Sequence, residues 1–267
     1  MTEPAATKTY RWKLFWVLYG AGLLTAVALL PYLQEQFKQV AAHMKGPVPS
    51  LDILQMLPIV LQNVVLLAIA TGVGLLLAGK IGLGAPILSA WLYGESANLK
   101  TGSIVLRSVV AGLISALVVV GLFVWYFLPR IPQLLAGNEY QYPVWKRFLA
   151  CFYGGIAEET LCRLFLMTLL AWLLGRFWKA SAGSPAAGAF WSANILAAVM
   201  FGVGHLPSAV ALGIPMNAVV VTDVVVLNGL LGVTFGWLYW KYGIESAMIA
   251  HFSSDMVLHV IGPHVVH

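Results

Sequence analysis

The chain of 267 residues is strongly apolar: 60% of its residues are hydrophobic and only 9% are charged, whereas an ordinary globular chain has about 25% charged residues. Together with a mean hydropathy of +0.87, this composition excludes a soluble domain. The formal net charge of +5 is therefore no sign of nucleic-acid binding, because Lys and Arg scattered between apolar runs are typical of helix ends and loops in a polytopic membrane protein.

Apolar runs of about the length that crosses a bilayer follow one another along the chain. A transmembrane helix needs roughly 20 such residues. The runs cover residues 14–30, 57–78, 104–128, 148–174, 190–212, 217–240 and 246–261. We predict an all-α, polytopic transmembrane helical bundle of about seven spans (six to eight), with the site inside the bundle. The first run is expected to be a retained span, because it is longer than the apolar core of a usual signal peptide.

The sequence also predicts the structure of the segments between these runs. Residues 34–55 are predicted to form a polar loop, and Gly213-Ile-Pro215 a tight turn between two spans. The apolar piece Pro86–Tyr93 is too short to span, so it is predicted to be a re-entrant or interfacial segment. An excess of Lys and Arg in alternate connections favours a cytoplasmic N-terminus.

Three ionisable residues fall inside the fourth predicted span, at a depth where each charge costs several kcal/mol. Glu159 and Arg163 are four residues apart, so they share a helix face and can form an internal ion pair. Glu158 points about 100° away and has no cation on its own helix. We therefore predict that Glu159 and Arg163 support the structure, whereas Glu158 is the candidate general base.

Further ionisable residues lie in the spans that follow. His205 comes after Gly204 and before Pro207, which is expected to bend or end the helix at that point. His251 and Asp255 are again four residues apart and can contact each other or face one cavity. Asp223 is predicted to be structural rather than catalytic.

These residues form three motifs in a defined order. Glu158-Glu-Thr-Leu-Cys-Arg163 fits E-E-x-x-x-R, Phe201-Gly-Val-Gly-His205 fits F-x-x-x-H, and His251-Phe-Ser-Ser-Asp255 fits H-x-x-x-N/D. In this order the chain resembles the CPBP family of intramembrane proteases, which contains the type II CAAX prenyl endopeptidases and the bacterial Abi-type relatives. The resemblance covers residues 148–261, so we divide the chain into N-terminal transmembrane helices (1–147) and a CPBP-like core (148–262).

The resemblance implies a glutamate-dependent endopeptidase that needs no cofactor and no metal. Glu158 with His205 would activate water, and His251 with Asp255 would form the oxyanion side. An ionised Asp cannot donate a hydrogen bond to an oxyanion, as an Asn can, so we expect Asp255 to orient His251. The expected partners are a peptide or protein substrate, which in relatives can have a lipidated C-terminus, and membrane lipids, but not nucleic acid. The expected location is a prokaryotic cell membrane.

Other functions are compatible with the same residues. His205, His251 and a carboxylate could be three ligands of a zinc protease, although the chain lacks an H-E-x-x-H motif. A membrane scaffold or immunity-type protein could use the same cavity to bind a peptide without cleaving it. A transporter could use buried Glu and His as a proton relay, but we find no repeated halves in the sequence.

Overall fold

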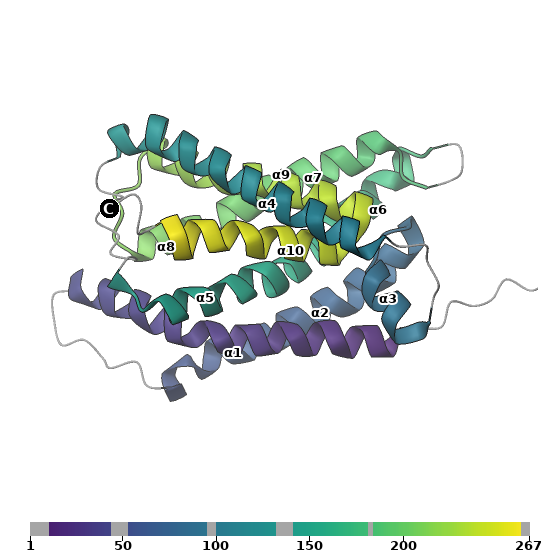
Figure 1. Ribbon diagram of the computed structural model, residues 1–267, viewed down its shortest axis with the longest axis horizontal. Helices are drawn as coiled ribbons and strands as arrows, with labels where there is room; N and C mark the ends of the chain where they lie inside the picture. The colour runs from purple at the N-terminus through teal and green to yellow at the C-terminus, as the bar shows by residue number, and fades with distance from the viewer. Residues whose placement is uncertain (1–10, 44–52, 95–99, 132–140, 181–183, 263–267) are drawn as a thin grey trace, which may run out of the picture.

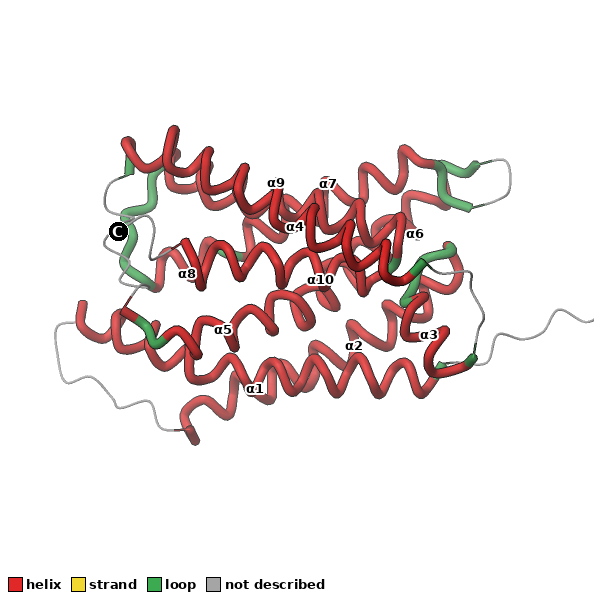
Figure 2. The backbone as a smooth tube through the Cα atoms, viewed as in Figure 1, coloured by secondary structure: helices red, strands yellow, loops and turns green. Residues whose placement is uncertain are grey.

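The computed structural model of the protein describes residues 11–43, 53–94, 100–131, 141–180 and 184–262. Within these ranges the regular structure is helical throughout, and the helices run roughly along one common axis (Figures 1 and 2). The predicted all-α fold is therefore confirmed. Residues 44–52 of the predicted loop 34–55 lie outside the described residues.

The described α-helices are numbered in chain order, and shorter 3-10 and π-helical segments extend several of them. Their bounds are α1 (Trp12–His43), α2 (Leu57–Ile81), α3 (Pro86–Tyr93), α4 (Thr101–Leu122), α5 (Val144–Phe152), α6 (Thr168–Phe177), α7 (Ala187–Gly204), α8 (Leu206–Ala211), α9 (Ala218–Tyr242) and α10 (Ile244–Asp255). Two π-helical segments, Tyr153–Glu158 and Thr160–Met167, join α5 to α6 through Glu159, so that one helix continues from residue 144 to residue 177.

Among the described residues, six helices are long and apolar enough to cross a membrane, which confirms the predicted six to eight spans at the lower limit and makes the chain a multi-pass membrane protein. Large apolar side chains on their outer faces are exposed, as in Leu24 (74%), Leu106 (64%) and Leu117 (62%). Such faces are stable against lipid and unfavourable in water. The outer surface of the bundle is therefore a lipid-facing surface.

The seventh predicted span forms a helix, α10, but it is not among the six apolar spans. In Figure 1, α10 lies in the middle of the bundle, with α4 and α9 on one side and α5 on the other. Because protein rather than lipid surrounds it, α10 can carry small and polar residues where a lipid-facing helix would carry large apolar ones. A central helix of this kind is suited to carry functional side chains.

Small residues bring α10 close to α4. The hydroxyl groups of Ser108 on α4 and Ser246 on α10 are 2.6 Å apart, and Ser254 Oγ donates to the carbonyl oxygen of Gly112 at 2.9 Å. A Cβ on Gly112 would overlap the carbonyl oxygen of Ala250, so only glycine permits this approach. The contact fixes the depth and rotation of α10 in the bundle.

One sequence-based boundary needs correction. The predicted loop 34–55 begins later than expected, because α1 passes through Pro31 and continues to His43. The residues after Pro31 are good helix formers such as Gln, Glu and Lys, and Glu35 forms ion pairs with Lys38 (3.0 Å) and with Lys146 of α5 (2.6 Å). The span predicted to end at residue 212 ends at Ala211, and within it α7 ends at Gly204 and the short α8 follows, as expected from Pro207.

The short apolar piece is helical over the predicted residues. Pro86 is the first residue of α3, where its missing N–H costs no hydrogen bond, and Gly94 ends the helix in a left-handed conformation. At the start of α3, the carboxylate of Glu245 accepts a hydrogen bond from the backbone N–H of Leu88 at 2.8 Å. A buried carboxylate from the start of α10 therefore caps this helix.

Candidate active site

The segment that carries Glu158, Glu159 and Arg163 is π-helical on both sides of Glu159. A π-helix has i→i+5 hydrogen bonds and a wider turn than an α-helix, and such segments occur frequently at functional sites. The predicted span 148–174 is thus helical as expected, but its geometry around the two glutamates differs from that of a regular α-helix.

The two neighbouring glutamates have different surroundings. The side chain of Glu159 is fully buried, and its Oε1 lies 2.8 Å from Nη1 of the equally buried Arg163. This ion pair was predicted from the spacing and is confirmed. The side chain of Glu158 is 23% exposed. Of the two carboxylates, Glu158 is therefore the one that water can reach.

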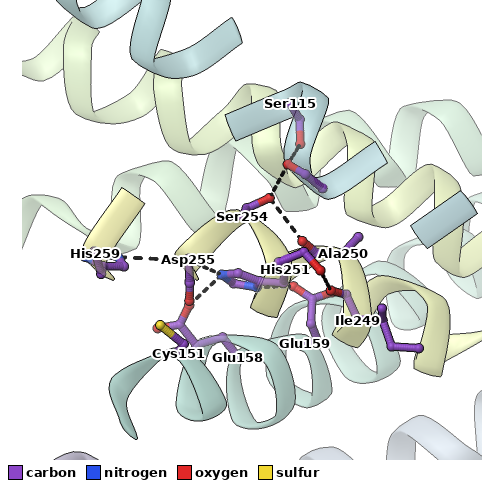
Figure 3. A network of polar contacts seen from close by, with 12 residues as sticks. Ser115, Cys151, Glu158, Glu159, Ile249, Ala250, His251, Ser254, Asp255 and His259 are labelled. Carbon is purple, nitrogen blue, oxygen red and sulfur yellow. Dashed lines mark hydrogen bonds and ion pairs between the residues drawn. The ribbon is translucent and has the colours of Figure 1, made fainter. Parts of the chain in front are cut away.

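His251 of α10 lies among three carboxylates (Figure 3). Its Nδ1 is 2.7 Å from Glu159 Oε1, while its Nε2 is 3.5 Å from Asp255 Oδ1 and 3.9 Å from Glu158 Oε2. Nearby negative charges stabilise the charged form of an imidazole, so this arrangement favours a cationic His251. The hydrogen bond to Glu159 fixes the ring, and the longer distances leave Nε2 able to bind another acceptor.

Aromatic rings enclose the cationic groups of the site. Phe235 of α9 stacks on the His251 ring at a centroid distance of 4.6 Å, and Phe201 of α7 meets it edge-on at 5.8 Å. The Arg163 guanidinium lies 4.7 Å from the Phe201 ring and 5.4 Å from the Phe235 ring. Cation–π contacts of this kind are strongest where water is excluded. Phe235 was not identified from the sequence, because one Phe in an apolar helix carries no distinctive signal.

His205 ends α7, as predicted from the Pro207 that follows it. Its Nδ1 is 2.8 Å from the carbonyl oxygen of Phe201, and its ring meets the Phe201 ring at 4.6 Å. Phe201 therefore contacts both histidines. Within the described part of the chain, the imidazole that comes within 4 Å of the Glu158 carboxylate is His251 and not His205. Contact between Glu158 and His205 thus requires a bridging molecule such as water.

Gly154 permits the approach of α10 to the glutamate helix. A Cβ at this position would overlap Oδ2 of Asp255 and lie 3.1 Å from Nε2 of His251. The neighbouring Gly155 similarly faces the backbone of Met248. The sequence analysis missed this role, although two adjacent glycines inside an apolar helix are a signal for close helix packing.

The N-terminal helices also contact the site-bearing segment. Tyr153 donates a hydrogen bond to Asn63 Oδ1 of α2 at 3.2 Å, and Asn63 Nδ2 donates to the carbonyl oxygen of Ile59 at 2.9 Å. The i→i+5 hydrogen bonding of the π-helix brings residues five apart, such as Tyr153 and Glu158, towards the same side. α2 therefore helps to hold the face of the segment on which Glu158 lies.

The sequence also singled out Asp223 and a possible set of zinc ligands. Asp223 is buried on α9, and its Oδ1 has no hydrogen-bonding partner among the described residues. In the same described ranges, no group of three or more His, Cys, Asp or Glu side chains has the geometry to hold a metal ion. His205, His251 and a glutamate are thus not arranged as the three ligands of the zinc alternative.

Comparison with protein-family models shows that residues 140–257 match the model for the Rce1-like type II CAAX prenyl endopeptidases. The matched region contains all seven specified residues of the three motifs: Glu158, Glu159, Arg163, Phe201, His205, His251 and Asp255. Comparisons with curated proteins and with solved structures gave no match.

Proposed function

Since residues 140–257 form a domain of the Rce1-like type II CAAX prenyl endopeptidase (CPBP) family, we propose that the chain is an intramembrane endopeptidase that uses Glu158 to activate water. One observation carries this proposal. Of the two adjacent glutamates, Glu159 is fully buried against Arg163, while Glu158 is partly exposed and lies beside the Nε2 edge of His251. A general base must be reachable by the water whose proton it accepts.

In the proposed reaction, the Glu158 carboxylate accepts a proton as the water oxygen bonds to the carbonyl carbon of a peptide bond. The electron pair of the C=O bond moves to the oxygen, and the resulting oxyanion accepts a hydrogen bond from His251 Nε2–H. When the C–N bond breaks, the proton passes from Glu158 to the departing amine. His205 would hold the water between itself and Glu158, which agrees with the absence of direct contact between the two side chains.

Asp255 acts on His251 in this scheme. Its Oδ1 lies 3.5 Å from Nε2, too far for a strong hydrogen bond but close enough to stabilise the imidazolium. Glu159 holds the other ring nitrogen at 2.7 Å. The two carboxylates thus keep His251 protonated and oriented without blocking Nε2. Preorganised donors of this kind contribute roughly 10²–10³ in kcat.

The test is cleavage of a membrane-reconstituted peptide by purified protein, with product identified by mass spectrometry. Glu158→Gln is expected to reduce cleavage by about 10²–10⁴, the usual contribution of a general base. Glu245→Gln is the matched control, because Glu245 is also a buried glutamate but lies outside the site. Cleavage by Glu158→Gln at the wild-type rate would refute the mechanism.

The substrate class is tested with two peptides that differ only in their C-terminal cysteine. One carries a farnesyl group on the cysteine of a C-a-a-X terminus, and the other carries a free thiol. We propose the prenylated peptide as the preferred substrate, with release of the three terminal residues. Equal cleavage of both peptides would show that the lipid is not recognised, while leaving the role of Glu158 intact.

The same assay distinguishes the alternative functions. Loss of cleavage with a chelator and its recovery with zinc would support the metalloprotease. Peptide binding without turnover, unchanged by Glu158→Gln, would support the non-catalytic scaffold.

A further inference from the structure

A cavity of about 650 Å³ opens at the end of the bundle where α1 begins and where α2 and α9 end. It is separate from the glutamate site: the residues that line it include none of the seven motif residues. Its cationic lining residues come from three segments, namely Arg11 before α1, Lys80 near the end of α2, and Lys241 near the end of α9.

Two of these cations are available to an anion. Lys80 and Lys241 are exposed, and each lies over an aromatic ring, at 5.8 Å from the Trp172 centroid and 3.7 Å from the Trp240 centroid. The ion pairs formed within the described ranges do not include either lysine. The nearby carboxylate of Glu245 is instead bonded to the start of α3. Within the described residues, neither Lys80 nor Lys241 is therefore paired with a carboxylate.

The backbone leaves room for a ligand beside these lysines. Gly79 in the last turn of α2 and Gly82 and Gly84 in the turn between α2 and α3 line the cavity, and a Cβ at any of them would meet no atom within 4 Å. Gly82 and Gly84 also adopt positive φ angles of 76° and 156°, which glycine accepts without strain. The turn thus keeps an open, side-chain-free edge on the cavity.

One wall of the cavity is apolar and continues onto the lipid-facing surface. Leu75, Leu76, Leu83 and Ile104 line it, and Leu76 is 51% exposed on the outer face of α2. Because α2 and α9 are both apolar spans that end here, the cavity lies at the depth of the lipid headgroups. A ligand with a phosphate and an acyl chain would place each part against matching chemistry.

We propose that this cavity is a binding site for the headgroup of an anionic phospholipid. The phosphate lies between Lys80 and Lys241, and an acyl chain follows Leu76 into the bilayer. Basic pockets between transmembrane helices bind anionic headgroups in this way. The site would connect the ends of α2 and α9 and so stabilise that end of the bundle.

The experiment measures lipid retention by native mass spectrometry of the detergent-purified full chain. Palmitoyl-oleoyl phosphatidylglycerol is titrated against the zwitterionic phosphatidylcholine with the same acyl chains. We expect Lys80→Gln/Lys241→Gln to weaken phosphatidylglycerol binding roughly 30-fold, about fivefold per cation removed. Lys100→Gln/Lys179→Gln removes the same charge from exposed positions at the same end but outside the cavity, and is expected to bind like the wild type.

A third variant and a competitor complete the test. Lys80→Arg/Lys241→Arg keeps both charges and is expected to retain binding, which separates loss of charge from loss of folding. Inorganic phosphate at the lipid concentration is expected not to displace the lipid. The proposal is overturned if the two glutamine double variants weaken binding equally, if phosphatidylcholine binds as tightly as phosphatidylglycerol, or if inorganic phosphate alone displaces the lipid.

Discussion

Replacing Arg163 with Met should strongly destabilise the protein, because it removes from the buried Glu159 carboxylate the permanently charged one of its two cationic partners, Arg163 and His251. Glu159 and Arg163 have side-chain exposures of 0% and 1%, and their charged atoms are 2.8 Å apart. Met keeps an apolar side chain between the rings of Phe201 and Phe235, so most of the packing is retained and the change is mainly one of charge.

The size of the effect follows from this burial. Breaking a buried ion pair by removing one partner costs about 3–5 kcal/mol, because the remaining charge stays desolvated. For a chain of this size, 1 kcal/mol corresponds to roughly 2–4 °C in the thermal midpoint. We therefore expect the midpoint of Arg163→Met to fall by about 10 °C.

A double-mutant cycle separates the charge interaction from other effects. Glu159→Gln removes the negative charge but keeps an oxygen that can accept the hydrogen bond from His251 Nδ1. The double variant Glu159→Gln/Arg163→Met therefore contains neither buried charge and still holds the histidine. Its thermal midpoint in detergent should lie closer to that of the wild type than the midpoint of Arg163→Met does.

Two results would contradict this reasoning. The first is an unchanged midpoint in Arg163→Met, which would mean that Glu159 is neutral or hydrated in the folded protein. The second is a double variant whose loss equals the sum of the two single losses, which would mean that the two side chains do not interact energetically.

Two further predictions concern packing and pH. Gly154→Ala places a Cβ against Asp255 and His251, so under the proposed function it should reduce cleavage by about 10²-fold, the typical effect of a shift of about 1 Å at a site. The control is Gly121→Ala, because a Cβ at that position meets no atom within 4 Å. Equal cleavage activity of the two alanine variants would refute the packing argument. Burial raises the pKa of Glu245 from 4.5 to about 7, against the opposing effect of its hydrogen bond from the Leu88 N–H. Between these two pH values the folded protein holds a proton that the unfolded chain has lost, so wild-type stability should fall by about 3 kcal/mol as pH rises from 4.5 to 7. Glu245→Gln should remove that fall when thermal midpoints are measured across this pH range. The same pH dependence of stability in the variant and in the wild type would contradict the prediction.

The sequence alone determined the features that depend on local spacing and on the membrane as solvent. A chain with 60% hydrophobic residues in long runs must satisfy its backbone within helices, so the helical bundle followed from composition. The pairing of Glu159 with Arg163 followed from a spacing of four residues. The end of α7 at Gly204 followed from Pro207, and the length of α3 from the short apolar run Pro86–Tyr93.

Only the tertiary structure decided how these parts meet. It gave the π-helical form of the segment around Glu158, the central position of α10, and the contact of His251 rather than His205 with both glutamates. It also gave the need for glycine at position 154 and the cationic cavity at the ends of α2 and α9. Each of these depends on the rotation and depth of helices that are far apart in the sequence. No local pattern encodes that geometry, because it results from packing over the whole bundle.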